Sequence, residues 1–311
     1  MEIILYRDWR NQPLRAVRQD VSNEEAQVWL GRALDSRKPF MAARFGNCEL
    51  QLMVHFHKMK NLALIWRLLD PIETWKWSFS WFKMPLREIE INAGFFPQDV
   101  RLIRQFVTIM HECITEVDLL ASWCKGEVWF EDQLGRATVC HRDALEAYRY
   151  QKPWTAKLAG RKVLVVHPFE TSIRSQYEKQ RTKLFSSPDV LPDFELHTLK
   201  AVQSIAGNRP EGFKTWFEAL DYMTDRAIAS PADVVILGCG AYGFPLAARL
   251  KRAGKQCIHM GGVTQLLFGI RGAAYDRPDS FVTRHINEYW IRPAPEERPK
   301  GAELVEGACY W

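Results

Sequence analysis

Three glycines in the second half of the chain have a spacing that suggests phosphate binding. Gly238, Gly240 and Gly243 match the pattern GxGxxG directly after the apolar run Val234 to Leu237, and the amphipathic segment that follows suits a helix. A strand, a glycine turn and a helix in this order bind phosphate groups through backbone N–H groups at the helix N-terminus. The pattern alone is compatible with a dinucleotide such as NAD.

A dinucleotide site needs a further residue that this chain lacks. An acidic side chain about 20 residues beyond the glycines normally binds the ribose hydroxyl groups. The sequence has Ile258, His259 and Met260 there, with no carboxylate and no arginine that would suit NADP. We therefore expect a nucleotide or another phosphorylated ligand and no NAD, with an NAD- or S-adenosylmethionine-binding enzyme as the alternative.

A second glycine turn follows at once. Gly261 and Gly262 precede Gln265 and Arg271, and glycines after a strand let the backbone approach a ligand closely. We predict that this segment faces the same nucleotide. His259, directly before it, is either a proton shuttle or pyrophosphate contact, or a buried histidine with a structural role.

The hexapeptide RFGNCE offers another candidate site near the N-terminus. It follows the apolar residues 39–43, and it places Arg44, Asn47 and Glu49 at the exit of a predicted strand. A guanidinium binds phosphate, and a carboxylate can act as a base or a metal ligand. The alternative is a salt-bridged turn with a structural role only.

The segment HPFETS supplies a third strand exit. Thr171 and Ser172 stand where a helix is predicted to begin after the apolar run 162–167, and Gln176 lies one turn further on. The helix N-terminus and the two hydroxyl groups together suit a phosphate. In the alternative, one hydroxyl only caps the helix.

Tryptophans alternate with polar residues between the predicted elements. Trp75, Trp77 and Trp81 would share one face of an extended segment. Such a face could stack on sugar rings or lie at a bilayer interface. Packing onto the core is the alternative, because aromatic side chains mostly serve burial.

The elements that must position these residues alternate along the chain. Short apolar runs predict strands at 39–43, 118–123, 162–167, 195–200 and 234–237, with a further strand ending near Ile258. Amphipathic patterns predict helices at 23–37, 97–117, 142–148, 173–185 and 212–229. Alternation of this kind predicts a Rossmann-like α/β fold: a mostly parallel sheet with helices on both faces and ligands at the carboxyl ends of the strands.

We predict one domain at 1–291 and an irregular strap at 292–311. The domain has an N-terminal half, 1–152, with a Trp-rich helical insertion at 61–97, and a nucleotide-binding C-terminal half, 153–291. The strap has three prolines in its first half and is predicted to pack through Tyr310 and Trp311.

Composition narrows the classes of partner and compartment. The net charge of +5 is spread over 42 basic and 37 acidic residues, which suits an anionic substrate or a membrane surface and not a nucleic acid. The seven cysteines never form CxxC, so we expect neither a zinc site nor a disulfide framework. Without a signal peptide or a long apolar run, a cytoplasmic protein is expected, free or peripheral at the inner face of the plasma membrane.

Three segments together resemble the GT-D fold glycosyltransferases of bacterial surface-glycan and glycoprotein glycosylation. They are RFGNCEL, ILGCGAYGFPLAARLKRAGK and IHMGGVTQLLFGIRG, and their order and spacing extend the resemblance over most of the chain. The resemblance implies a Rossmann-like enzyme that transfers a sugar from a nucleotide-diphosphate donor, with a UDP-sugar favoured. It also implies a metal-associated DxE motif within RxGDGE, at the positions of Asn47 and Glu49.

Asn47 departs from that motif, because asparagine is neutral and binds Mn or Mg more weakly than aspartate does. Glu49 could bind a divalent cation through its one carboxylate. Alternatively, Arg44 and the helix N-termini could neutralise the leaving diphosphate without a metal.

These observations predict a glycosyltransferase of capsule, lipopolysaccharide or glycoprotein glycan assembly that acts on a polymeric or lipid-linked acceptor. Arg44, Asn47 and Glu49 would lie at the reaction centre, and the glycine turns and HPFETS at the nucleotide. The tryptophans would contact the acceptor or the membrane. A catalytically degenerate scaffold with the same fold is a further alternative, because Asn47 departs from the motif.

Overall fold

The computed structural model describes residues 18–66, 86–278 and 280–311 and, within α2, the side chains up to residue 58. The candidate residues Trp75, Trp77 and Trp81 therefore lie outside the described residues. In the described part, none of the helices combines the length and the apolar composition that a bilayer crossing requires.

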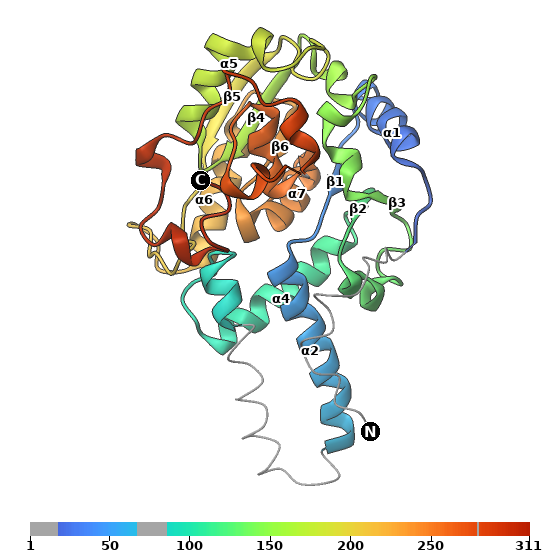
Figure 1. Cartoon of the computed structure of the whole chain (residues 1–311). Helices are drawn as coiled ribbons and strands as arrows, with labels where there is room; N and C mark the ends of the chain where they lie inside the picture. Colours follow the sequence, from blue (N-terminus) through green and yellow to red (C-terminus); the bar gives the residue numbers. More distant parts are fainter. Residues whose placement is uncertain (1–17, 67–85, 279) are drawn as a thin grey trace.

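A seven-stranded parallel sheet forms the centre of the molecule (Figure 1). The strand order is β3-β2-β1-β7-β6-β4-β5, and every pair of neighbours is parallel. The strands are β1 (Phe40–Ala43), β2 (Leu119–Ser122), β3 (Thr138–His141), β4 (Lys162–His167), β5 (Glu195–Lys200), β6 (Val234–Leu237) and β7 (Gln256–His259). The predicted α/β fold with a parallel sheet is confirmed.

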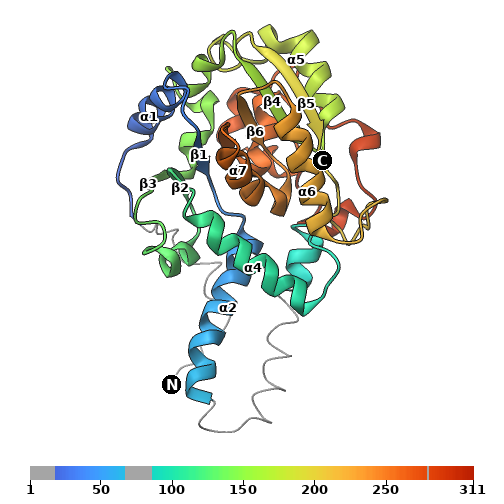
Figure 2. The same ribbon diagram turned by 180° about the vertical axis from the view of Figure 1, so that it is seen from behind.

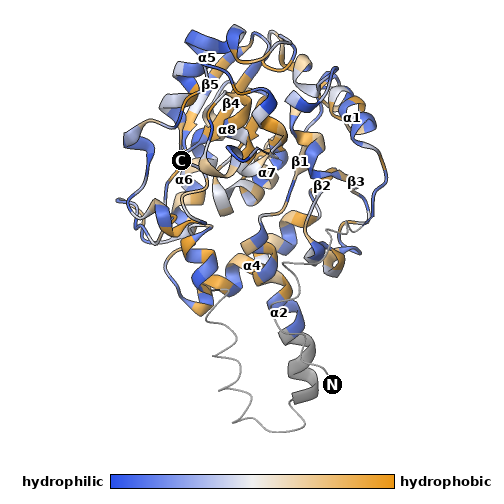
Figure 3. Cartoon of the chain, viewed as in Figure 1, coloured by the Kyte–Doolittle hydropathy of each residue, from blue (hydrophilic) through white to orange (hydrophobic). Residues whose placement is uncertain are grey.

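The central strands are apolar because both of their faces are covered. In β4, Val163 and Val165 belong to the core on one face, whereas Leu164 and Val166 belong to the core on the other. This alternation follows from the pleat, which directs successive side chains to opposite faces. Figure 3 shows hydrophobic residues around the central strands and hydrophilic residues on the outer helices α1 (Asn23–Asp35) and α5 (Glu170–Leu184).

Helices cover the two faces of the sheet separately (Figures 1 and 2). One face carries α4 (Val100–Ile114), α6 (Trp216–Ala229) and α7 (Gly243–Arg252), and the other carries α1 and α5. The short helix α8 (Thr264–Leu267) follows β7, and α2 (Asn47–Trp66) extends away from the sheet. Local signals fix some ends: Ser22 and Glu25 form a capping box for α1.

The topology creates a crevice between β4 and β6. The chain leaves β4 through α5 toward β5, whereas it leaves β6 through α7 toward β7, in the opposite direction along the sheet. Right-handed crossovers then put α5 and α7 on opposite faces. Ligands bind at such a switch point, outside the carboxyl ends of the strands.

Several predicted bounds differ from the structure. The edge strand β3 was not predicted, and residues 142–148 form two 3₁₀ turns in place of a helix. The helix expected at 97–117 begins at Val100, because Asp99 caps it. The strap contains two 3₁₀ helices, Pro295–Glu297 and Ala302–Leu304, and is otherwise largely irregular.

Candidate active site

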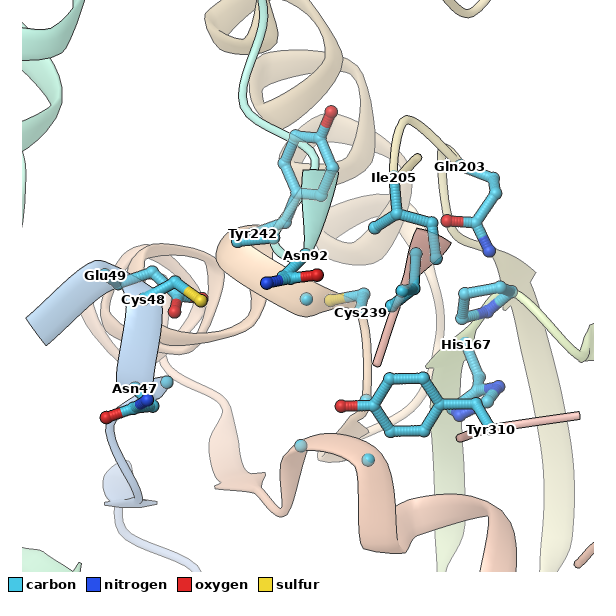
Figure 4. A pocket seen from close by; sticks show the side chains of 18 of the residues that line it. Asn47, Cys48, Glu49, Asn92, His167, Gln203, Ile205, Cys239, Tyr242 and Tyr310 are labelled. Carbon is cyan, nitrogen blue, oxygen red and sulfur yellow. The ribbon is translucent and has the colours of Figure 1, made fainter. Parts of the chain in front are cut away.

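A cavity of about 180 Å³ lies at the carboxyl edge of the sheet (Figure 4). It is lined by residues at or beyond the ends of six strands: 44–49 (β1), Trp123 (β2), 167–169 (β4), 202–205 (β5), 238–240 (β6), and His259 with 261–262 (β7). Further lining residues are Asn92, Ala93, Tyr242 and Gln265, together with Val305, Glu306, Tyr310 and Trp311 of the strap. The structure therefore brings RFGNCE and both glycine turns to one cavity, as the topology predicts.

Arg44 supplies positive charge to this cavity. Its guanidinium lies 4.7 Å from the ring centroid of Trp123, and the guanidinium of Arg142, which follows β3, lies 5.4 Å from the same ring. The indole N–H of Trp123 donates to the carbonyl oxygen of Phe45 at 2.8 Å, which ties the ring to the end of β1. The arrangement orients a guanidinium for an anion.

A buried carboxylate fixes the loop that carries Trp123. Glu127 accepts hydrogen bonds from the backbone N–H groups of Trp123 at 3.3 Å and Cys124 at 3.1 Å, and from the Ser122 hydroxyl. Burial raises the pKa of Glu127 to about 7, although these hydrogen bonds oppose the rise. Glu127 is a positioning residue that the sequence did not single out.

Glu49 is a candidate acid or base. It lies in the first turn of α2 and is 7% exposed. Its carboxylate folds back over Gly46, where a Cβ atom would overlap both carboxylate oxygens. Burial raises the pKa of Glu49 to about 7, against the hydrogen bond from its own backbone N–H and the charge of Arg44. A group with this pKa exchanges a proton readily at neutral pH.

Asn47 and Glu49 do not form a metal-binding pair. The Asn47 side-chain oxygen accepts from the Cys124 thiol at 4.0 Å, while the Glu49 carboxylate is turned onto Gly46. In the described part of the chain, no three His, Cys, Asp or Glu side chains come close enough to hold a metal ion. A hard divalent cation needs several oxygen ligands, and this donor set does not provide them.

Two buried histidines in the cavity wall are neutral. Burial lowers the pKa of His167 to about 3 and that of His259 to about 4. The Phe169 N–H donates to His167 Nδ1 at 2.9 Å, so the proton of His167 is on Nε2. His259 Nδ1 lies 3.3 Å from the Leu237 carbonyl oxygen and donates to it. This bond favours the structural role for His259.

The first glycine turn is contacted by the protein itself. Gly240 has a φ of +57°, and a Cβ atom there would lie 3.2 Å from the Ala93 carbonyl oxygen. The Ala241 N–H donates to the same oxygen at 3.2 Å. The segment that ends the helical residues 86–91 therefore lies on the turn and uses one of the N–H groups predicted for phosphate.

The other two motif glycines also make room for side chains. A Cβ atom on Gly238 would lie 2.6 Å from the Thr264 hydroxyl oxygen, and one on Gly243 would overlap the His259 ring. Gly238 and Gly240 line the cavity, whereas Gly243 does not. Packing thus requires glycine at all three positions of GxGxxG, whether or not a nucleotide binds.

The second glycine turn meets the strap. A Cβ atom on Gly262 would lie 2.5 Å from the Tyr310 ring. The Gln265 side chain, also in the cavity wall, donates to the Tyr310 carbonyl oxygen at 3.1 Å. Arg271 lies outside the lining and pairs with Asp276 at 3.7 Å.

HPFETS reaches the cavity through 167–169 only. The N–H groups of Thr171 and Ser172 donate to the carboxylate of Glu297 at 2.8 and 3.2 Å, and the Ser172 hydroxyl donates to it as well. Gln176 donates to the carbonyl oxygens of Gly269 and Tyr289. An anion does lie at this helix N-terminus, as the sequence suggested, but it is a side chain of the strap.

Sequence reasoning missed several residues of the cavity. Figure 4 shows Asn92, Cys239 and Tyr310 around its middle, with Cys48 and Glu49 on one side and His167 and Gln203 on the other. Asn92, Gln203 and Glu306 have no local pattern that marks them. The aromatic end of the strap predicted packing for Tyr310 but not a place in the site.

Comparisons of the chain with protein-family models, with curated proteins and with solved structures give no match. Function must therefore be inferred from the chemistry of the cavity.

Proposed function

We propose that this protein is a glycosyltransferase that moves a sugar from a nucleotide-diphosphate sugar to a hydroxyl group of an acceptor. One observation carries the proposal: the Glu49 carboxyl group, with its pKa raised to about 7, shares a cavity at the carboxyl edge of a parallel sheet with the Arg44 guanidinium. Group transfer from a diphosphate needs a base and a countercharge.

Each group has a defined role in the proposed reaction. Glu49 takes the proton of the acceptor hydroxyl as the acceptor oxygen bonds to the anomeric carbon of the sugar. The bond from that carbon to the diphosphate oxygen breaks, and its electron pair stays on the diphosphate. Arg44, held against Trp123, stabilises the negative charge of the leaving diphosphate. No step uses a metal, because the donor set at Asn47 and Glu49 does not fit one.

A UDP-sugar is the favoured donor, and a surface polysaccharide, a lipid-linked glycan or a glycoprotein glycan the favoured acceptor. Both preferences follow from the resemblance of the three sequence segments to the GT-D fold glycosyltransferases. The proposed location is the cytoplasm or the inner face of the plasma membrane. An NAD- or S-adenosylmethionine-dependent reaction is less well supported, because Ala93 lies on the turn that such a cofactor would use.

A panel of donors tests the proposal. The full chain is incubated with UDP-, GDP-, CMP- and TDP-sugars, and binding is measured by calorimetry and donor breakdown by release of the free nucleotide. We expect saturable binding of one nucleotide class and slow hydrolysis that Glu49→Gln strongly reduces without loss of binding. Glu303→Gln, which changes an exposed carboxylate of the strap, is the control. Absence of binding and turnover with every donor would show the proposal to be wrong.

A further inference from the structure

The strap gives the cavity a wall that the sheet does not provide. Residues 292–311 follow all seven strands in the chain and cross the carboxyl edge, where Glu306 and Tyr310 enter the lining (Figure 1, red). The sheet and its helices already account for the parts of the site nearest Arg44 and Glu49. The strap side chains therefore require an explanation of their own.

The first half of the strap is fixed at two points. Glu297 is 5% exposed, and its carboxylate binds the N-terminus of α5 through Thr171 and Ser172. The Ala294 N–H donates back to the Ser172 hydroxyl oxygen at 3.0 Å. Further along, the Asn208 amide donates to the Lys300 carbonyl oxygen at 2.8 Å.

The second half is fixed against the turn after β7. The Trp311 carbonyl oxygen accepts from the Ala273 N–H at 3.0 Å and from Arg292 at 2.9 Å. Together with the bond from Gln265 to Tyr310 and the contact of the Tyr310 ring with Gly262, these bonds hold the ring in one place. Its hydroxyl group points toward the middle of the cavity (Figure 4).

Glu306 is presented by an unusual backbone. Residues 306, 307 and 308 have φ values of 47°, 69° and 62°, and two of the three, Glu306 and Ala308, are not glycine. Left-handed conformations of such residues are unfavourable and tend to persist where a site requires them. Within the strap, the Glu306 carboxylate accepts only a weak hydrogen bond from the Cys309 thiol, at 3.8 Å. Glu306 is exposed and lines the cavity, so its remaining hydrogen-bonding capacity is open to solvent or to a ligand.

Glu306 also lies close to the reaction centre. After burial and Glu49, the charges of Glu88 and Glu306 raise the pKa of the Cys48 thiol, which adjoins Glu49 in α2. The Asn92 and Gln203 side chains lie in the same cavity. This part of the wall thus offers the carboxyl groups of Glu49 and Glu306, the amides of Asn92 and Gln203, and the phenol of Tyr310. Groups of these kinds bind vicinal hydroxyls.

We propose that Glu306 and Tyr310 form the subsite for the sugar of the donor, and that this subsite accepts a neutral hydroxylated ring and rejects an anionic one. The inference rests on the proposed function. The Glu306 carboxylate accepts from sugar hydroxyl groups, and the Tyr310 ring and hydroxyl provide an apolar surface and a polar contact. A uronate carboxylate would face Glu306 and be repelled.

Calorimetry with UDP, UDP-glucose and UDP-glucuronate tests the subsite in the full chain. We expect the wild type to prefer UDP-glucose, and Glu306→Gln to reduce its preference over UDP-glucuronate about tenfold while changing UDP affinity less than about twofold. Tyr310→Phe should weaken UDP-glucose binding alone. Glu303→Gln, on the same strap but outside the lining, should match the wild type.

The outcomes separate the two proposals. If UDP binds but Glu306→Gln and Glu303→Gln show the same sugar preference, the assignment of the sugar subsite to Glu306 and Tyr310 is wrong. The proposed function then still stands. If neither UDP nor either UDP-sugar binds, the proposal that the donor is a UDP-sugar is wrong. The subsite is then judged by saturation-transfer NMR with methyl glucoside and methyl glucuronate. Selective binding of the glucoside that Glu306→Gln removes supports it, and equal binding or none overturns it.

Discussion

The carboxylate of Glu49 occupies the space above Gly46 that a side chain at that position would fill. The two residues are therefore coupled: the absence of a Cβ atom on Gly46 lets Glu49 turn back, become buried and acquire its raised pKa. A residue without a side chain thus controls the protonation state of the proposed base.

Gly46→Ala should move the Glu49 carboxylate out of its buried position. Greater solvation lowers the pKa of Glu49 from about 7 toward its ordinary value. We expect kcat to fall by roughly ten- to a hundredfold, because general-base catalysis depends on the matched pKa and position. The pH–rate profile of the variant should shift to lower pH, and an unshifted profile would contradict the coupling.

Transfer activity should rise with pH through about 7, because Glu49 acts in its ionised form. Glu49→Gln should flatten this limb of the kcat/KM profile. A profile of unchanged shape in that variant would assign the titration to another group.

The raised pKa of Glu49 also predicts that the folded protein becomes less stable as the pH rises, whereas its activity increases. Between the unfolded pKa of 4.5 and the folded pKa of about 7, the unfolded chain loses the Glu49 proton first. The free energy of unfolding should therefore decrease across this pH range by an amount that Glu49→Gln removes. Urea unfolding of both proteins at several pH values measures the difference, and equal slopes against pH would contradict it.

Arg44→Lys should weaken binding of the nucleoside diphosphate about tenfold, because an ammonium group neither stacks on Trp123 nor binds phosphate with two parallel hydrogen bonds. Calorimetry with UDP measures the loss. Arg101→Lys, whose side chain is 90% exposed, is the matched control and should bind as the wild type does.

Glu297→Gln should loosen the strap, because an amide supplies one acceptor oxygen to the N-terminus of α5 in place of two and carries no charge. We expect a loss of about 1–2 kcal/mol in the free energy of unfolding. Reaction of the buried Cys309 thiol with a disulfide reagent should become faster. Glu296→Gln changes the exposed neighbour on the same 3₁₀ helix and should leave both measurements unchanged.

Removal of divalent cations with EDTA should leave donor hydrolysis within about twofold of its original rate, because Asn47 and Glu49 do not present a set of hard oxygen ligands. Restoration of a lost activity by manganese would show that the side chains rearrange around a metal during turnover.

The sheet could be predicted because its central strands, β4 and β6, are apolar on both faces and leave a continuous signal. The strand β3 has four residues at the edge of the sheet and no such signal. The convergence of RFGNCE with the glycine turns was predictable, since parallel strands end at one edge. The partner of Ser172 was not, because Glu297 lies 125 residues away in the chain and no local pattern connects them.

The strap adds no strand to the sheet, yet it delivers two side chains of the proposed sugar subsite from within six residues. Donor choice could therefore change in evolution by replacement of this segment alone, while the sheet, Arg44 and Glu49 stay the same. A chimaera that carries a different strap but retains Glu297 would separate catalysis from donor selection. The residues on the sheet would supply the catalysis, and the new strap would supply the donor selectivity.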